Sequence, residues 1–178
     1  MKFSDITQFT NPGNYQIDIS LKYLPKTIRE YEEDYGLELN PDFQRGNVWT
    51  REQQIAYLEF FFRGGKSGRT VFFNQPDISY ATDIPNMVCV DGLQRLTALL
   101  GFMNNEIPIF GGHYYRNFED GLRQTEHTIK VCINNLQWRK DVLRWYLEMN
   151  SGGTVHSKEE LERVAELYEA ECKKNSHE

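Results

Sequence analysis

Residues 87–102, MVCVDGLQRLTALLGF, constrain the fold most, because a buried strand runs directly into a helix there. Hairpins also use Asp-Gly, but the residues after Asp91 and Gly92 have helical spacing. Apolar side chains recur at three- and four-residue steps, at Leu96, Leu99, Leu100 and Met103. An acid, a glycine, an amide (Gln94) and a cation (Arg95) therefore meet at a strand-to-helix junction, where a protein can hold an anion.

Strand and helix patterns alternate along the rest of the chain. Apolar or alternating runs predict strands at 15–20, 69–74, 86–91 and 129–136. Helical patterns cover about 20–35, 51–63, 92–104, 139–150 and the segment after 157. We therefore expect an α/β fold of the mixed α+β kind, a single compact domain in which helices pack on a small, at least partly parallel sheet.

Capping residues predict where three of these helices begin. Ser20 is the expected cap of the first helix, which has Pro25 near its first turn and Gly36 at its end. Thr50 with Gln53 forms a capping box, and Ser157 with Glu160 forms a second one.

Composition narrows the possible partners and the compartment. The chain has 178 residues and a formal charge of −6, which argues against coating nucleic acid by bulk attraction but allows a local basic groove. The first ten residues lack the apolar core of a signal peptide, and no run approaches a membrane span. Three scattered cysteines are typical of reduced thiols. We expect a cytoplasmic protein, in the host cytoplasm if it is viral, without a membrane partner.

The segment RGGKSG, residues 63–68, contains the Gly-Lys-Ser of a P-loop but lacks the rest of that motif. A P-loop needs a glycine where Phe60 stands, between a strand and a helix, and here a helix precedes. Arg63, Lys66 and Arg69 are instead expected to form a basic turn. It is either solvated, which is the more common case, or in contact with a DNA phosphate backbone.

The segment NPDFQRGNVW, residues 40–49, places polar side chains between two apolar anchors, Phe43 and Trp49. It is either a loop pinned by aromatic rings, with Arg45 satisfied by a carboxylate, or a polar rim for phosphate or base. In the second case Gln44 and Arg45 supply the donors, and Arg45 offers a planar fork of N–H groups.

The segment DGLQR, residues 91–95, also has two interpretations. Asp91 can cap the helix while Gly92 permits the turn. Capping, however, requires neither Gln94 nor Arg95, which add to the positive end of the helix dipole. Asp91 beside them could hold Mg²⁺ or accept a proton from a nucleophile, the combination that phosphoryl transfer requires.

The segment MNSGGTVHS, residues 149–157, is a glycine turn before the last helix. It is either a plain helix–helix connection or a second loop facing an anion. In the second case the donors are Asn150, the Gly152 and Gly153 amides, and Thr154.

Together the three polar segments resemble the signatures of the ParB/sulfiredoxin-like superfamily, and most closely the N-terminal domain of GmrSD-type restriction enzymes. The resemblance runs from about Ile17 to Val164, which sets the expected core, and 165–178 would be the end of the last helix and a tail. It implies a nucleotide-binding α/β domain that uses Mg²⁺ and a nucleoside triphosphate, ATP or GTP. Asp91 would be the catalytic or metal-binding carboxylate, with Arg95 and Gln94 on the phosphates. Gln44 and Arg45 would complete the pocket, closed by Asn150, Gly152, Gly153 and Thr154.

Two positions depart from the family pattern. Leu93 replaces the first glutamine of D-G-Q-Q-R, which removes one polar group, and His156 replaces a leucine. Three hypotheses follow. The first is a phosphotransferase acting on DNA, such as a kinase for a hydroxymethylated base in viral or mobile-element DNA. The second is an NTP-binding or NTP-hydrolysing regulator of a restriction or anti-restriction system. The third is a non-catalytic interaction domain. A homodimer and a separate nuclease partner both remain open.

Overall fold

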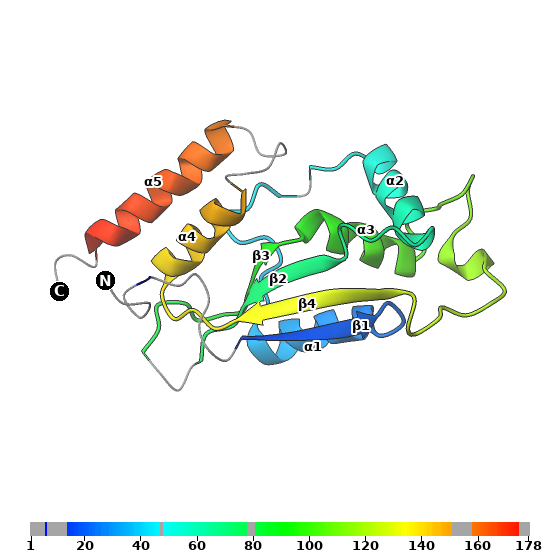
Figure 1. Ribbon diagram of the computed structural model, residues 1–178, viewed down its shortest axis with the longest axis horizontal. Coiled ribbons are helices and arrows are strands. Elements are labelled where there is room, and N and C mark those ends of the chain that lie inside the picture. Colours follow the sequence, from blue (N-terminus) through cyan, green and yellow to red (C-terminus); the bar gives the residue numbers. More distant parts are fainter. Residues whose placement is uncertain (1–5, 7–13, 47, 78–80, 151–157, 175–178) are drawn as a thin grey trace.

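A computed structural model describes residues 6, 14–46, 48–77, 81–150 and 158–174. Within these residues the chain forms five α-helices, a 3-10 turn and one four-stranded sheet (Figure 1). The single mixed α+β domain expected from the sequence is confirmed.

The sheet is mixed, as predicted. Its strands stand in the order β1-β4-β2-β3, with β2 and β4 parallel and the two outer pairs antiparallel. The strands span Tyr15–Ser20 (β1), Thr70–Asn74 (β2), Val88–Asp91 (β3) and Thr128–Asn134 (β4). Each lies within about two residues of its expected position.

One irregularity in the sheet was not expected. Phe72 pairs with Asp91 but Phe73 pairs with Cys89, so Val90 is an extra residue in β3. Such a bulge redirects the side chains that follow it. Asp91 therefore shares a sheet face with its partner Phe72, whose ring packs edge-on against Trp145 of α4 at 6.0 Å.

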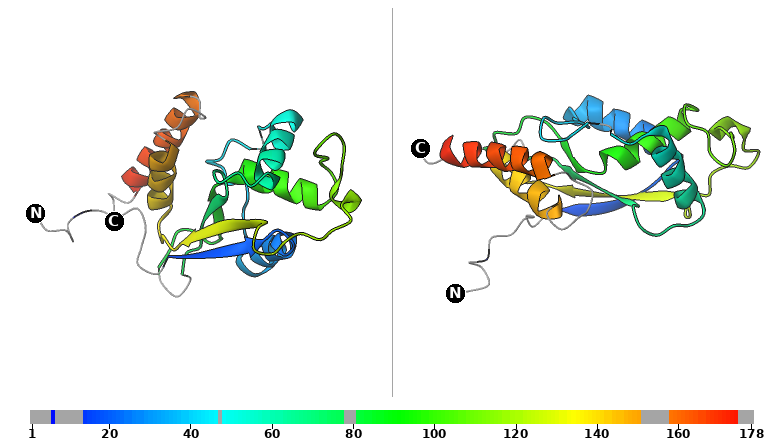
Figure 2. Two further views of the ribbon diagram at one scale, coloured as in Figure 1. Left: turned by 45° about the vertical axis from the view of Figure 1, so that its right-hand side comes forward. Right: turned by 90° about the horizontal axis from the view of Figure 1, so that it is seen from above.

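The helices are α1 (Leu24–Tyr35), α2 (Arg51–Phe62), α3 (Leu93–Met103), α4 (Arg139–Asn150) and α5 (Lys158–Lys174), and η2 (Tyr115–Asn117) is the 3-10 turn. The first three cover one face of the sheet, while α4 and α5 pair on the other side (Figure 2).

The larger core lies under α1, α2 and α3. Alternate residues of the strands point into it, among them Val71, Phe73, Cys89 and Val131, and these are fully buried. Leu58 of α2 and Leu99 of α3 meet them from the helices. Full burial of such side chains contributes about 1.5–3 kcal/mol each, so this core stabilises the packing of the three helices on the sheet.

A second core joins α4 and α5 to the sheet. The intervening residues of β3, Val88 and Val90, point into it, together with Leu143 of α4 and Val164 of α5. Phe43 packs there edge-on against Tyr146, with ring centroids 5.4 Å apart. This contact brings the 40–49 segment to the α4 side of the sheet.

Two helix starts can be compared with their predicted caps. The Thr50–Gln53 capping box is present, with both reciprocal hydrogen bonds. Ser20 was the wrong cap for α1, because it is the last residue of β1 and α1 begins four residues later at Leu24. Residues 21–23 instead form a turn that buries Leu21 in the core. The predicted Ser157–Glu160 box lies outside the described residues at Ser157.

Candidate functional site

The strand-to-helix junction depends on a glycine. Gly92 has φ +113° and is the N-cap of α3. A Cβ atom there would lie 2.4 Å from Cγ1 of Val71. Only glycine therefore allows β3 to turn into α3 this closely against β2.

Asp91 does not cap α3, so the capping interpretation of this residue was wrong. Among the described residues no side chain caps the helix; the Asp91 carboxylate instead forms an ion pair with the Arg95 guanidinium, one turn along. The two side chains are 33% and 23% exposed, so a ligand can reach both. In the described part of the chain, Asp91 Oδ1 has no hydrogen-bond partner and Arg95 Nε is buried without one.

Gln44 and Gln94 hold the 40–49 loop against this junction. The Gln44 amide donates to the carbonyls of Cys89 and Val90, at 3.1 and 2.9 Å. The Gln94 side-chain oxygen accepts from the backbone N–H groups of Val48 and Trp49, both at 3.0 Å, and its nitrogen donates to the Gly46 carbonyl. Contact of either glutamine with phosphate stays a prediction, and in this structure both amides organise the loop.

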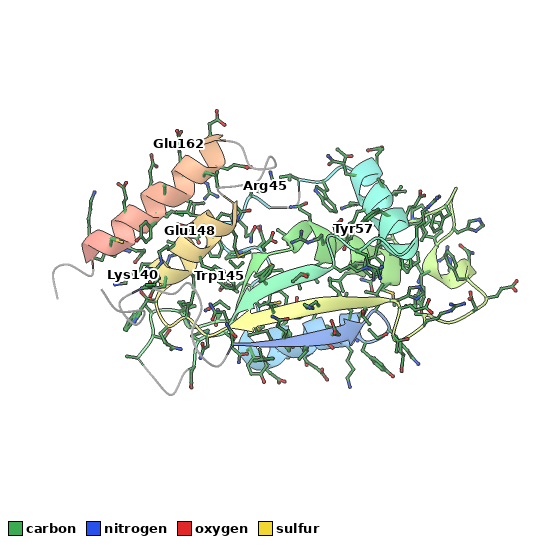
Figure 3. The ribbon with its side chains drawn as sticks, in the orientation of Figure 1. Arg45, Tyr57, Lys140, Trp145, Glu148 and Glu162 are labelled. Atoms are coloured by element: carbon green, nitrogen blue, oxygen red, sulfur yellow. The ribbon has the colours of Figure 1, made fainter. Side chains whose placement is uncertain are left out.

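Arg45 lies where the loop passes between the α4–α5 pair and α2 (Figure 3). Its Nη1 contacts Oε2 of Glu160 at 3.3 Å, and the two side chains are 16% and 28% exposed. A second α5 side chain, Arg163, donates to the carbonyls of Asp42, Phe43 and Gln44 at 2.8, 3.1 and 3.2 Å. The loop is therefore held by α3 on one side and by α5 on the other.

These elements enclose a cavity of about 260 Å³, which we call the junction pocket. Among the described residues its lining includes three charged side chains, Arg45, Asp91 and Arg95, and three apolar ones, Trp49, Leu93 and Met149. Gln44, Gly92, Gln94 and Asn150 also line it. A pocket with both charged and apolar lining suits a phosphorylated ligand with an aromatic or aliphatic part.

Leu93 and Asn150 also have structural partners. Leu93 is 7% exposed and packs in the larger core as well as lining the pocket. Asn150 is 8% exposed and donates to the Tyr146 carbonyl at 2.7 Å. Gly152, Gly153 and Thr154 lie outside the described residues, as does His156.

Tyr146 belongs to the charged surroundings of the pocket, although its sequence position on an apolar helix face indicates only a core residue. Burial raises the pKa of its hydroxyl; Arg45 and Arg163 lower this pKa, while Glu160 and Asp91 raise it. One buried hydroxyl is thus close enough to sense charges from the loop, β3 and α5. Glu160 and Arg163 were likewise not identified as site residues from the sequence.

The pocket residues fit a magnesium ion only in part. Mg²⁺ in nucleotide sites is usually held by one or two carboxylates, the phosphates and water. Asp91 supplies one such carboxylate, and no group of three or more His, Cys, Asp or Glu side chains suited to a metal occurs among the described residues. This donor set suits an ion that arrives with a nucleotide better than a resident ion in a protein cage.

The basic turn after α2 is divided between exposed and structural cations. Arg63 and Lys66 are exposed, and Arg63 lies over the Phe110 ring at 5.1 Å. Arg69 instead donates to the carbonyls of Phe61, Gly65, Glu126 and Thr128, and stacks on Phe61. DNA contact by this turn stays a prediction, and only Arg63 and Lys66 present their charge to solvent.

Tyr57 links that turn to the 40–49 loop. Its hydroxyl donates to the Gly68 carbonyl at 2.8 Å, and its ring packs against Trp49, with ring centroids 5.3 Å apart. Burial raises the pKa of Tyr57 to about 12, although Arg95 and Arg69 act in the opposite direction. Tyr57 therefore packs against Trp49, which lines the junction pocket, as a neutral side chain.

The chain also matches a known protein family. Residues 26–177 match the family described as GmrSD restriction endonuclease, N-terminal domain. The chain belongs to this family. The GmrSD N-terminal match includes the 40–49 loop, the junction and the whole of α5. No curated protein and no solved structure matches the chain. No described helix is both long enough and apolar enough to span a membrane.

Proposed function

We propose that this GmrSD N-terminal domain binds a nucleoside triphosphate with Mg²⁺ in the junction pocket and transfers its terminal phosphoryl group to a hydroxyl on DNA. Its family is that of restriction endonucleases, which indicates a DNA-acting protein in a restriction system. The acceptor that we favour is the hydroxyl of a hydroxymethylated base.

The observation that carries the proposal is the Asp91–Arg95 pair at the start of α3 within the junction pocket. The exposed N–H groups of a helix N-terminus and a nearby arginine favour anions, and Arg45 adds a second guanidinium. The volume of about 260 Å³ is slightly below the roughly 300–1,000 Å³ of pockets that hold a whole ligand. It suits the phosphates, with the nucleoside extending over Trp49.

Phosphoryl transfer needs positioning and charge stabilisation more than covalent chemistry from the protein. Arg95 and Arg45 hold the phosphate oxygens as charge spreads over them. The acceptor oxygen bonds to the terminal phosphorus while the bond to the bridging oxygen breaks, leaving a nucleoside diphosphate. Asp91 has one of two roles: it accepts the proton of the acceptor hydroxyl, or it would hold Mg²⁺, which neutralises phosphate charge, while solvent takes that proton.

A second candidate function is NTP hydrolysis that regulates a partner nuclease. The family match favours it, because the family is named for an endonuclease and the described residues contain no metal cluster of nuclease type. In this case water replaces the DNA hydroxyl as acceptor, and the same Asp91 and Arg95 are required. DNA contact through Arg63 and Lys66 would be local and strongly salt-dependent.

The test follows γ-labelled ATP or GTP with Mg²⁺, with unmodified or hydroxymethylated DNA. Label on the DNA, reduced at least about 100-fold in Asp91→Asn, is the expected result. Asp18→Asn is the matched control, because Asp18 is exposed on β1. Free phosphate alone would support the regulator. Absence of turnover with either nucleotide would overturn both catalytic proposals and leave an interaction domain.

A further inference from the structure

Helix α5 contacts the polar loop through two side chains on one side of its first turns. Arg163 donates to three successive carbonyls, those of Asp42, Phe43 and Gln44. Unpaired carbonyls of a loop are mobile, and a planar guanidinium with a fixed fork of donors can orient several of them at once. Arg163 thus fixes the backbone from which the Gln44 and Arg45 side chains project.

The second side chain, Glu160, is one helical turn before Arg163 and contacts Arg45. This places a protein carboxylate on one of the two guanidinium groups that line the junction pocket. Arginine binds carboxylate and phosphate through the same planar geometry. A phosphate that binds Arg45 must therefore compete with the Glu160 carboxylate.

The Glu160–Arg45 ion pair is weak enough for a bound ligand to break it. Its N–O distance is 3.3 Å and its side chains are partly exposed, and ion pairs open to solvent typically contribute about 0–1 kcal/mol. A phosphate carries more charge and three acceptor oxygens, so it forms the stronger charge-assisted hydrogen bonds. Displacement of Glu160 by a bound phosphate is energetically feasible.

The surroundings of Tyr146 indicate that the charges of α5 and of the pocket form one cluster. The pKa of this buried side chain is raised mainly by burial, and Arg45, Glu160, Asp91 and Arg163 all act on it as well, so charges of the loop, β3 and α5 gather around one tyrosine. Val164, beside Arg163, is buried in the second core and holds this face of α5 toward the loop.

We propose that α5 completes and controls the junction pocket: Arg163 positions the loop that bears Gln44 and Arg45, and Glu160 is an internal counter-ion on Arg45 that a phosphate ligand must displace. This inference rests on the proposed nucleotide site and adds its regulation. Because coupling between two binding events is reciprocal, a ligand that displaces Glu160 also weakens the attachment of α5. Occupancy of the pocket then changes how firmly α5 is held.

The first experiment measures pyrophosphate binding to the whole chain by calorimetry. Glu160→Gln should bind about two- to fivefold more tightly than the wild type, because the competing charge is lost. Glu166→Gln is the matched control, since Glu166 is an exposed glutamate of the same helix, and it should leave the affinity unchanged. Wild-type binding with no gain in Glu160→Gln would overturn the counter-ion role while the proposed nucleotide site stands.

The second experiment tests Arg163 without any ligand. In Arg163→Lys, amide hydrogen exchange at Gln44 and Gly46 should accelerate at least about threefold, because a compact ammonium lacks the planar fork of donors that spans the three carbonyls. In the wild-type structure both amides are hydrogen-bonded, to the Pro41 carbonyl and to the Asn40 side chain. Arg123→Lys, on an exposed loop, is the control.

The two measurements separate the possible failures. If neither the wild type nor Glu160→Gln binds pyrophosphate, the proposed nucleotide site is wrong and the counter-ion role falls with it. The positioning role of Arg163 is then tested by the amide hydrogen-exchange measurement alone. Unchanged exchange in Arg163→Lys would overturn that role whatever the binding result.

Discussion

At the residue scale, Gly92 is the position where backbone conformation and packing impose the same requirement. Gly92→Ala should lower the free energy of unfolding by about 2–5 kcal/mol, because a positive φ and a collision with Val71 act together. Urea denaturation of the purified variant measures this loss. Gly111→Ala separates the two causes, since Gly111 has φ +83° but no atom within 4 Å of a Cβ. An equal loss in both variants would show that the close approach to Val71 contributes nothing.

Cys89 provides a second prediction at this scale. Its thiol is fully buried, and burial, together with nearby Asp91, raises its pKa well above the ordinary value of 9.0. At pH 8 a thiol reagent should label Cys132 and Cys172, which are partly exposed, while Cys89 reacts only as the chain unfolds. Mass spectrometry of the labelled peptides measures this difference.

The raised pKa of Cys89 also makes the free energy of unfolding depend on pH. Because the folded pKa of Cys89 is raised, the unfolded chain loses this proton first, so the stability contribution is full below about pH 9 and declines above it. In Cys89→Ala this part of the decline should be absent. A variant with the same alkaline decline as the wild type would contradict the assignment.

At the element scale, the start of α2 depends on its capping box. Thr50→Ala should cost about 0.5–2 kcal/mol, because the Gln53 N–H loses its acceptor. Thermal or urea unfolding measures this cost. Thr125→Ala makes the same chemical change at an exposed loop position and should stay within about 0.5 kcal/mol of the wild type.

The attachment of the 40–49 loop to α3 gives a second prediction at the element scale. Gln94→Ala removes three hydrogen bonds to that loop and should lower stability by about 1–3 kcal/mol. Gln94→Glu keeps the acceptor for Val48 and Trp49 but loses the donor to Gly46, so we expect an intermediate loss. If Gln94→Glu is no more stable than Gln94→Ala, the two N–H contacts do not hold the loop. Comparison of urea midpoints decides between these results.

At the scale of the whole molecule, the two cores share one sheet. Cys89 of β3 points into the larger core, while Val88 and Val90 point into the second. Leu99→Ala and Val90→Ala, one in each core, should therefore each shift a single unfolding transition, by about 2–5 and about 1–3 kcal/mol. Coincident near- and far-ultraviolet circular dichroism curves are expected. Two separated transitions would show that α4 and α5 unfold independently.

Much of the fold could be predicted from the sequence, because local patterns report local structure. Residue spacing and turn-forming residues predict the strand-to-helix junction at Asp91–Gly92, the capping box at Thr50 and the mixed sheet. The expected cap at Ser20 failed because the burial of Leu21 and Leu24, a tertiary requirement, moved the start of α1.

The sequence alone predicted only part of the candidate site. Sequence motifs identified Gln44, Arg45, Asp91, Gln94 and Arg95, which the fold brings together around one pocket. They did not show that both glutamine side chains hold the loop, since hydrogen-bond partners about 46 residues apart leave no local signal.

The sequence by itself determined that an acid, a positive-φ glycine and an arginine stand at the start of a helix, since these depend on neighbours within one turn. Only the tertiary structure decided what surrounds them. The bulge at Val90 turns Asp91 toward α4, and the packing of Val164 brings Glu160 and Arg163 to the loop. Both depend on burial of apolar side chains from distant segments, and a linear pattern does not encode which distant segments meet.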